Sequence, residues 1–207
     1  MKTMLLFILL LAAGSVAFPQ TRDYELQGIG MISIPDDLEL QSQNYISNAT
    51  GMPVSQASSS RFVFQQSGLN DGEANAFDKY VRVIIAKGMN STKAEPLPLN
   101  YNATAEEMKT LNTMLKSGLS DDLAPGNVLL GWGGAQLVNS EVNYQSAIES
   151  SYLRRYQTNL PVVVFTYLLF DDDYVYVIML SCREQALKYW RPRFQKIFES
   201  FKIINDG

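Results

Sequence analysis

The stretch "VVVFTYLLFDDDYVYVIMLSCREQALKYWRPRFQKIFESFKI", residues 162–203, decides the expected fold. Two apolar runs, 161–170 and 174–182, are joined by three aspartates and followed by a segment with helical periodicity. A link this short requires an antiparallel hairpin, because a parallel crossover needs about a dozen residues or more. Apolar residues occupy both alternating faces of the two strands, which predicts a sheet that is covered on both sides.

The end of this stretch predicts a C-terminal helix. Ser181 and Glu184 fit a capping box, and we expect the helix to run to about Lys202. Its apolar stripe consists of Leu187, Trp190, Phe194, Ile197 and Phe201. Pro192 lies inside this helix and lacks a backbone donor, so a kink or a short break is expected there.

The sequence before this stretch supplies further strands and one more helix. Alternating apolar residues predict strands at 28–35, 61–66, 80–88, 128–138 and 147–157. Thr104 and Glu107 form a capping box for a helix, and Gly118 fits its C-terminal cap. We therefore expect a single α+β domain over 18–207, an antiparallel sheet covered by helices on both faces.

Residues 162–203 resemble the C-terminal half of the superfamily that contains the photosystem II extrinsic protein PsbP, the Ran-binding Mog protein and DcrB-like bacterial envelope proteins. The matching features are the hairpin ending in "YVYVIML", the helix ending in "FQKIFESFKI", and the proline before its last turns. "GIGMISIPDDLEL", 28–40, is similar to the opening strand of that superfamily. The resemblance implies a PsbP-like α/β/α sandwich and favours the bacterial envelope branch. It brings no catalytic motif, because the members share a fold and differ in function.

The first 17 residues, "MKTMLLFILLLAAGSVA", have the pattern of a secretory signal peptide. Lys2 precedes an apolar run, and small residues at Ser15 and Ala17 predict cleavage after Ala17. The run is shorter than the roughly 20 residues that span a bilayer. We expect an exported protein, periplasmic or extracellular, without membrane insertion after the signal is removed.

Composition removes several classes of chemistry. The chain has no histidine, which excludes imidazole-based metal sites and catalysis by Ser-His-Asp or Cys-His groups. A formal charge of −4 argues against nucleic acid as a partner. Cys182 is the only cysteine, and we expect it to be a buried small hydrophobe. The sequence thus predicts no catalytic residue, no metal and no cofactor.

Two motifs have a structural and a functional interpretation. Asp171, Asp172 and Asp173 turn the chain, hold a divalent cation or act as an acid/base pair. The turn is favoured, because neighbouring side chains point apart and calcium needs six to eight oxygen ligands. Trp132, within the glycine-rich "GWGG", either packs in the core or offers an exposed platform for a ligand.

The best candidate for a partner surface is formed by Tyr152, Arg154 and Tyr156, which alternate onto one face of a strand. Arginine and tyrosine are enriched at the hot spots of protein interfaces. The alternative is an ordinary solvated strand end. Separately, Asn48, Asn90 and Asn102 begin glycosylation sequons, which matter only if the host glycosylates.

Two hypotheses of function remain. In the first, the protein is an exported non-catalytic protein that binds a protein partner, such as an envelope protein, or assists an envelope assembly. In the second, it is a small-ligand or metal binder or a carboxylate-dependent enzyme. The second hypothesis needs acids from distant segments, such as Asp36 or Asp121, to meet near the three aspartates or Trp132.

Overall fold

The structure is a computed structural model that describes residues 20–42, 61–69, 79–123, 125–157 and 159–204, without the side chains of residues 121 and 122. The predicted signal peptide and most of the polar segment 41–60 lie outside these ranges.

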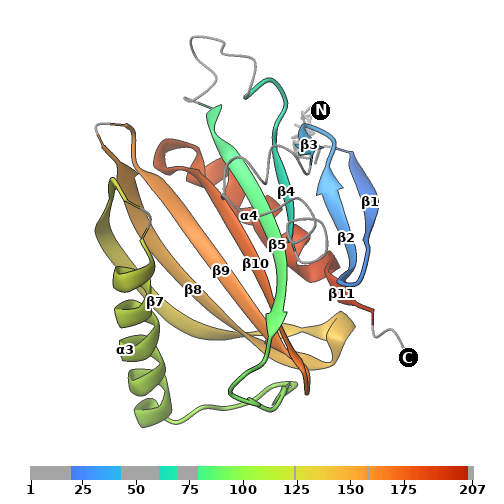
Figure 1. Cartoon of the computed structure of the whole chain (residues 1–207), viewed down its shortest axis with the longest axis vertical. Helices are drawn as coiled ribbons and strands as arrows, with labels where there is room; N and C mark the ends of the chain where they lie inside the picture. Colours follow the sequence, from blue (N-terminus) through green and yellow to red (C-terminus); the bar gives the residue numbers. More distant parts are fainter. Residues whose placement is uncertain (1–19, 43–60, 70–78, 124, 158, 205–207) are drawn as a thin grey trace, which may run out of the picture.

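The described chain forms two antiparallel sheets (Figure 1). The larger has eight strands in the order β3-β4-β5-β10-β9-β8-β6, with β7 paired to β8, and the smaller has the order β1-β2-β11. The strands are β1 (Thr21–Leu26), β2 (Gly30–Pro35), β3 (Leu38–Leu40), β4 (Arg61–Gln66), β5 (Val81–Met89), β6 (Leu97–Pro98), β7 (Asn127–Ser140), β8 (Gln145–Tyr156), β9 (Val162–Phe170), β10 (Tyr174–Arg183) and β11 (Lys202–Ile203). The predicted antiparallel hairpin of β9 and β10 is present, and it lies in the middle of the larger sheet.

Helix α3 (Ala105–Asp122) begins as predicted and ends later. The Thr104 side chain accepts from the backbone of Glu107, and the Glu107 carboxylate accepts from the backbone of Thr104, so the capping box is confirmed. The predicted cap at Gly118 is wrong, because the helix continues and packs Leu119 against the sheet.

Helix α4 (Leu187–Ser200) starts later than predicted. Ser181 does not cap it, because β10 continues to Arg183 and the Ser181 hydroxyl instead lies 3.2 Å from the hydroxyl of Tyr80. The helix is not broken at Pro192. Proline lacks a backbone N–H, so the helix loses one hydrogen-bond donor there. Within the described residues, no helix is both long and apolar enough to cross a membrane.

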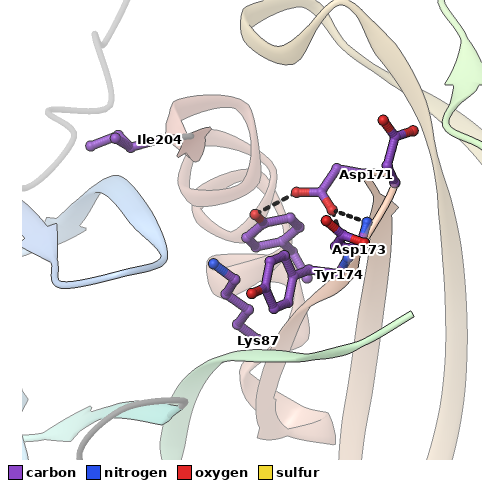
Figure 2. A pocket seen from close by; sticks show the side chains of 7 residues that line it. Lys87, Asp171, Asp173, Tyr174 and Ile204 are labelled. Atoms are coloured by element: carbon purple, nitrogen blue, oxygen red, sulfur yellow. Dashed lines mark hydrogen bonds between the residues drawn. The ribbon is translucent and has the colours of Figure 1, made fainter. Parts of the chain in front are cut away.

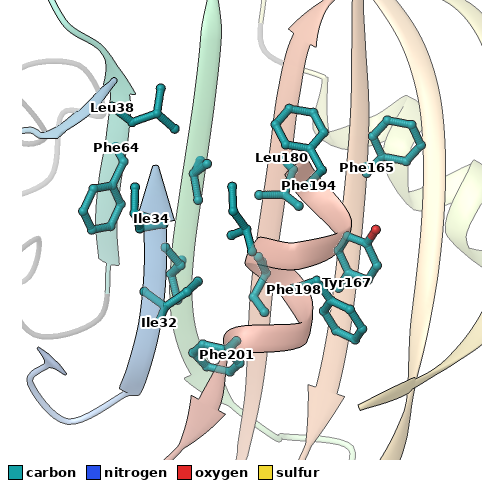
Figure 3. Close-up of a cluster of buried hydrophobic side chains, with 14 of the residues drawn as sticks. Ile32, Ile34, Leu38, Phe64, Phe165, Tyr167, Leu180, Phe194, Phe198 and Phe201 are labelled. Atoms are coloured by element: carbon teal, nitrogen blue, oxygen red, sulfur yellow. The ribbon is translucent and has the colours of Figure 1, made fainter. Parts of the chain in front are cut away.

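One face of the larger sheet packs against α4 and β2 to form the main core (Figure 3). Of the predicted apolar stripe, Trp190, Phe194, Ile197 and Phe201 are buried and Leu187 is half-buried. Phe198, which the predicted stripe did not include, is buried as well. The rings of Tyr167 on β9 and Phe198 stack with centroids 4.2 Å apart. This face is therefore well covered over β5, β9 and β10.

The opposite face is covered only in part. There α3 packs on β7, at the margin of the sheet, and a smaller cluster forms around Tyr152 and Val164 (Figure 1). Side chains of β5, β9 and β10 on this face, such as Ile84, Leu168 and Val177, remain partly exposed. The α+β architecture with one helix on each side is thus present, but the predicted cover is extensive on the α4 face and only partial on the other.

Candidate binding site at one end of the sheet

Several connections meet at the end of the sheet where β9 joins β10 (Figure 1). The link 171–173 lies beside the turn that follows β5, since the Asn90 N–H donates to the carbonyl of Asp173 at 2.8 Å. The connection between β7 and β8 is a 3-10 turn, η2 (Glu141–Asn143), which lies beside β11. Antiparallel order brings these connections together, because alternate turns emerge at the same end of a sheet.

The three aspartates occupy the hairpin link, and the side chains of Asp171 and Asp173 have different partners. Asp171 Oδ1 accepts from the backbone N–H groups of Asp173 and Tyr174, at 3.0 and 2.6 Å, while its Oδ2 accepts from the Tyr176 hydroxyl at 2.7 Å (Figure 2). Asp173 forms an exposed ion pair with Lys93 at 2.8 Å, which lowers its pKa below the ordinary value. The Asp171 carboxylate therefore closes the turn by accepting from the backbone N–H groups that follow it, the role that aspartate commonly has in turns.

The acids of the second hypothesis do not gather here. Asp36 lies in the turn between β2 and β3 and is 3.9 Å from Arg22, and the side chain of Asp121 is outside the described residues. Among the residues that the structure describes, no three acidic or cysteine side chains form a group that could hold a metal ion.

Asn90 is a structural residue of this end. It is 3% exposed, and both hydrogens of its amide are used, in bonds to the carbonyls of Ala94 (2.7 Å) and Asp171 (2.9 Å). A glycan attached to Nδ2 would replace one of these donated hydrogens, and the burial of Asn90 leaves the sugar no path to solvent. The sequon at Asn90 is thus incompatible with glycosylation in this fold, whereas Asn102 is exposed and Asn48 lies outside the described residues.

A first cleft of about 310 Å³ opens between Lys87, Tyr174 and the aspartates (Figure 2). The ammonium group of Lys87 donates to the carbonyl of Gly28 at 2.9 Å and lies 3.8 Å from the centroid of the Tyr174 ring. Its charge is thus held in place by a carbonyl and an aromatic face.

A second cleft of about 370 Å³ adjoins the first at Asp171, which lines both. Its apolar lining includes Pro96, Val142, Phe170 and the aromatic ring of Tyr144. Tyr144 is 83% exposed, the most exposed large apolar side chain in the described part of the chain. This end of the sheet therefore combines a preformed cleft with an unburied aromatic ring.

The backbone at Tyr144 is strained and firmly held. Its φ of 52° is left-handed, which costs a residue with a side chain about 1–2 kcal/mol. The neighbouring Asn143 amide donates to Ser140 Oγ and to the carbonyl of Phe201, each at 2.8 Å, and its Oδ1 accepts from the N–H of Ile203 at 2.8 Å. Backbone strain that the surroundings enforce is found preferentially at functional sites.

The predicted partner surface is only partly available. Tyr152 is 8% exposed and belongs to the smaller cluster under α3, where burial raises its pKa. Arg154 is half-buried and donates to Asn127 Oδ1, and Tyr156 is 43% exposed. A surface of Arg154 and Tyr156 thus remains, and its partner stays a prediction.

Two other sequence candidates have structural roles. Trp132 packs against the smaller cluster and its Nε1–H donates to Asn112 Oδ1 on α3 at 3.2 Å, so it is no exposed platform. Cys182 is fully buried, and burial raises the pKa of its thiol to about 12.

A polar network between β8, β9 and α4 was not predicted. Arg191 donates to Glu149 at 2.7 Å and to the Tyr167 hydroxyl at 3.2 Å, and Gln136 donates to Glu149 at 3.2 Å. Glu149 is 5% exposed, and clefts of about 350 and 230 Å³ that share these polar groups open beside it. The only sign of this network in the sequence is Glu149, a carboxylate within a strand, and its partner Arg191 is 42 residues further along the chain.

Comparison with known proteins bears on the fold. No protein family and no curated protein matches the sequence. The structure is similar to cyanobacterial PsbP (CyanoP) from Synechocystis sp. PCC 6803, with a TM-score of 0.54 and 13% identity over 94% of this chain and 99% of that one.

More distant similarities have TM-scores of 0.45 and 0.42. The first is to PA94 from Pseudomonas aeruginosa, a protein of unknown function, at 10% identity over 90% of this chain and 98% of that one. The second is to LpqN of Mycobacterium tuberculosis, described as involved in cell envelope biogenesis, at 16% identity over 90% and 91%. At these identities a similarity concerns the fold alone, and the assignment of the fold rests on the similarity to CyanoP. The chain has the PsbP-like fold that residues 162–203 predict.

Proposed function

We propose that the protein is an exported, non-catalytic binding protein, and that its partner is a protein of the cell envelope that docks beside Tyr144. Export is supported by the signal-peptide pattern of residues 1–17. The observation that carries the proposal is Tyr144, 83% exposed, at the rim of a cleft that is lined by both apolar and polar side chains.

The chemistry of an interface anchor supports this proposal. Tyrosine is among the residues that contribute most to binding energy, because its ring buries a large area and its hydroxyl still finds a partner. Asn143 fixes the backbone next to Tyr144 to the C-terminal segment. A side chain on a backbone that is already ordered loses less entropy on binding.

The experiment is a capture from the native envelope. The tagged mature protein is expressed in its own host and cross-linked, and the co-purifying proteins are compared for wild type, Tyr144→Asn and Met114→Gln. Asparagine tolerates left-handed φ, and Met114 is a 66% exposed control on α3. We expect a reproducible partner that Tyr144→Asn loses and Met114→Gln keeps.

The other outcomes are equally informative. A partner lost from Arg154→Ala or Tyr156→Ala and kept by Tyr144→Asn would move the interface to the end of β8. A partner set that no variant changes would refute docking beside Tyr144.

Small-ligand binding at Arg191 is a second candidate, favoured by the buried Glu149 and its two adjoining clefts. Its test is a thermal-shift screen of neutral and charged small molecules. A ligand that stabilises wild type and fails on Arg191→Met would support it, and a screen without such a ligand would count against it.

A further inference from the structure

We infer that the segment which docks beside Tyr144 carries a lysine or arginine next to its apolar anchor. The inference rests on the proposed function and adds the chemistry of the partner. Its basis is the charge around the second cleft, where acidic side chains outnumber basic ones.

The charged side chains that line the two clefts or flank their lining residues are the acids Glu95, Glu141, Asp171, Asp172 and Asp173 and the bases Lys87, Lys93 and Lys202. Lys93 is paired with Asp173, whereas Lys87 contacts only neutral groups, the carbonyl of Gly28 and the ring of Tyr174, and keeps its charge. The net charge around the clefts is still negative, because the acids outnumber all three bases.

Two of the acids are available to a partner. Glu141 and Asp172 are exposed and lie in the turns on either side of the second cleft. Neither carboxylate forms an ion pair with any residue that the structure describes. A cation of the partner would meet them without displacing an existing pair.

The apolar and the charged parts have different tasks. Burial of an apolar side chain against Val142, Phe170 and the Tyr144 ring supplies most of the affinity. Exposed charges add little affinity each, but they accelerate association, orient the partner and make binding sensitive to salt. A segment with both features matches the cleft, whereas an acidic segment would be repelled.

The test uses short random peptides displayed on phage, panned against the immobilised mature chain. Phage that also bind Tyr144→Asn are removed before sequencing. We expect the remaining peptides to share an apolar residue with a neighbouring lysine or arginine. The strongest is then synthesised, and its affinity is measured by calorimetry at low and high salt.

Charge variants separate the effect of the acidic side chains from that of the apolar contacts in the cleft. We expect Glu141→Lys with Asp172→Lys to weaken the synthetic peptide about tenfold and to remove its salt dependence. Glu184→Lys is the matched control, because Glu184 is exposed and follows β10 at the other end of the sheet. It should change the affinity less than twofold.

Failure of the charge inference can be told from failure of the docking proposal. Peptides that depend on Tyr144 but are acidic or neutral, or that bind the double variant unchanged, would overturn the basic-segment inference and leave the cleft as a docking site. If no peptide depends on Tyr144, the proposed function itself is refuted. A dimer in analytical ultracentrifugation that Tyr144→Asn dissolves would assign the cleft to a second copy and overturn the inference.

Discussion

The side chain of Asn143 donates to the main-chain carbonyl of Phe201, 58 residues further along the chain, at 2.8 Å. It also accepts from the N–H of Ile203, so one amide joins the β7–β8 connection to the segment that leaves α4. Phe201 itself is fully buried in the main core. The turn that contains Tyr144 is thereby hydrogen-bonded to a segment anchored in the main core.

This relationship predicts that Asn143→Ala destabilises the protein. Loss of the amide leaves the Phe201 carbonyl and the Ile203 N–H without their partner, which should lower the free energy of unfolding by about 1–3 kcal/mol. Urea denaturation followed by circular dichroism measures the change. Asn102→Ala is the control on an exposed asparagine and should stay within about 0.5 kcal/mol. Equal stability of the two variants would show that the Asn143 bonds do not fasten the turn.

Tyr144→Gly should separate stability from binding. Glycine adopts a φ of 52° without strain, so the free energy of unfolding should be unchanged or rise by about 1 kcal/mol. Partner capture should be lost, because the ring is gone. A clear loss of stability in this variant would mean that Tyr144 is a structural residue.

Asn90→Ala should be strongly destabilising. The Asn90 side chain bonds to the backbone of Ala94 through both its Nδ2 and its Oδ1, and to the carbonyl of Asp171. Because the residue is buried, the orphaned groups cannot all return to water, and we expect a loss of about 3 kcal/mol in thermal or urea unfolding. A loss below about 0.5 kcal/mol, the range of a surface substitution, would contradict the role assigned to Asn90.

The pair of Glu149 and Arg191 should show energetic coupling. Removal of one partner leaves a charge next to a largely buried site, while removal of both does not. The single variants Glu149→Gln and Arg191→Gln and the double variant form a cycle, measured by urea denaturation. We expect a coupling free energy of about 1–3 kcal/mol. Simple additivity would show that the pair does not anchor α4 to β8.

Cys182 predicts a dependence of stability on alkaline pH. Burial raises its thiol pKa from the ordinary 9.0 to about 12, so the folded state keeps the proton longer than the unfolded state. The stability contributed by the neutral thiol is complete below pH 9 and is lost as the pH rises toward 12. Cys182→Ala should show a shallower decline in urea titrations across this range. A native thiol that reacts rapidly with a thiol reagent at pH 8 would contradict its burial.

Local sequence patterns predicted most of the strands and the sides of the helices. The bounds of β4 agree with the alternation of residues 61–66, and the predicted stripe on α4 is buried except at Leu187, which is half-buried. Element ends were less predictable. Ser181 fits a helix cap by spacing, but its hydroxyl lies against Tyr80, 101 residues away. No pattern predicted β1, which is mostly exposed and depends on pairing with β2.

The site was less predictable than the fold, because it consists of contacts between distant turns. The sequence predicts that Asp171 lies in a turn, but no pattern in it predicts that Tyr144 lines the same cleft. Tyr144 lies in a polar connection without a motif, and its significance depends on a left-handed φ and on the cleft beside it. Conversely, the alternation that selected Tyr152 also describes a residue buried under a helix.

The most direct test of the central claim is site-specific photo-cross-linking in the native envelope. A photoreactive phenylalanine derivative replaces Tyr144 in one strain and Met114 in another, and the products are compared after irradiation. Docking beside Tyr144 predicts one discrete cross-linked protein from position 144 that is absent from position 114. The absence of a product at position 144, or the same products from both positions, would contradict docking beside Tyr144.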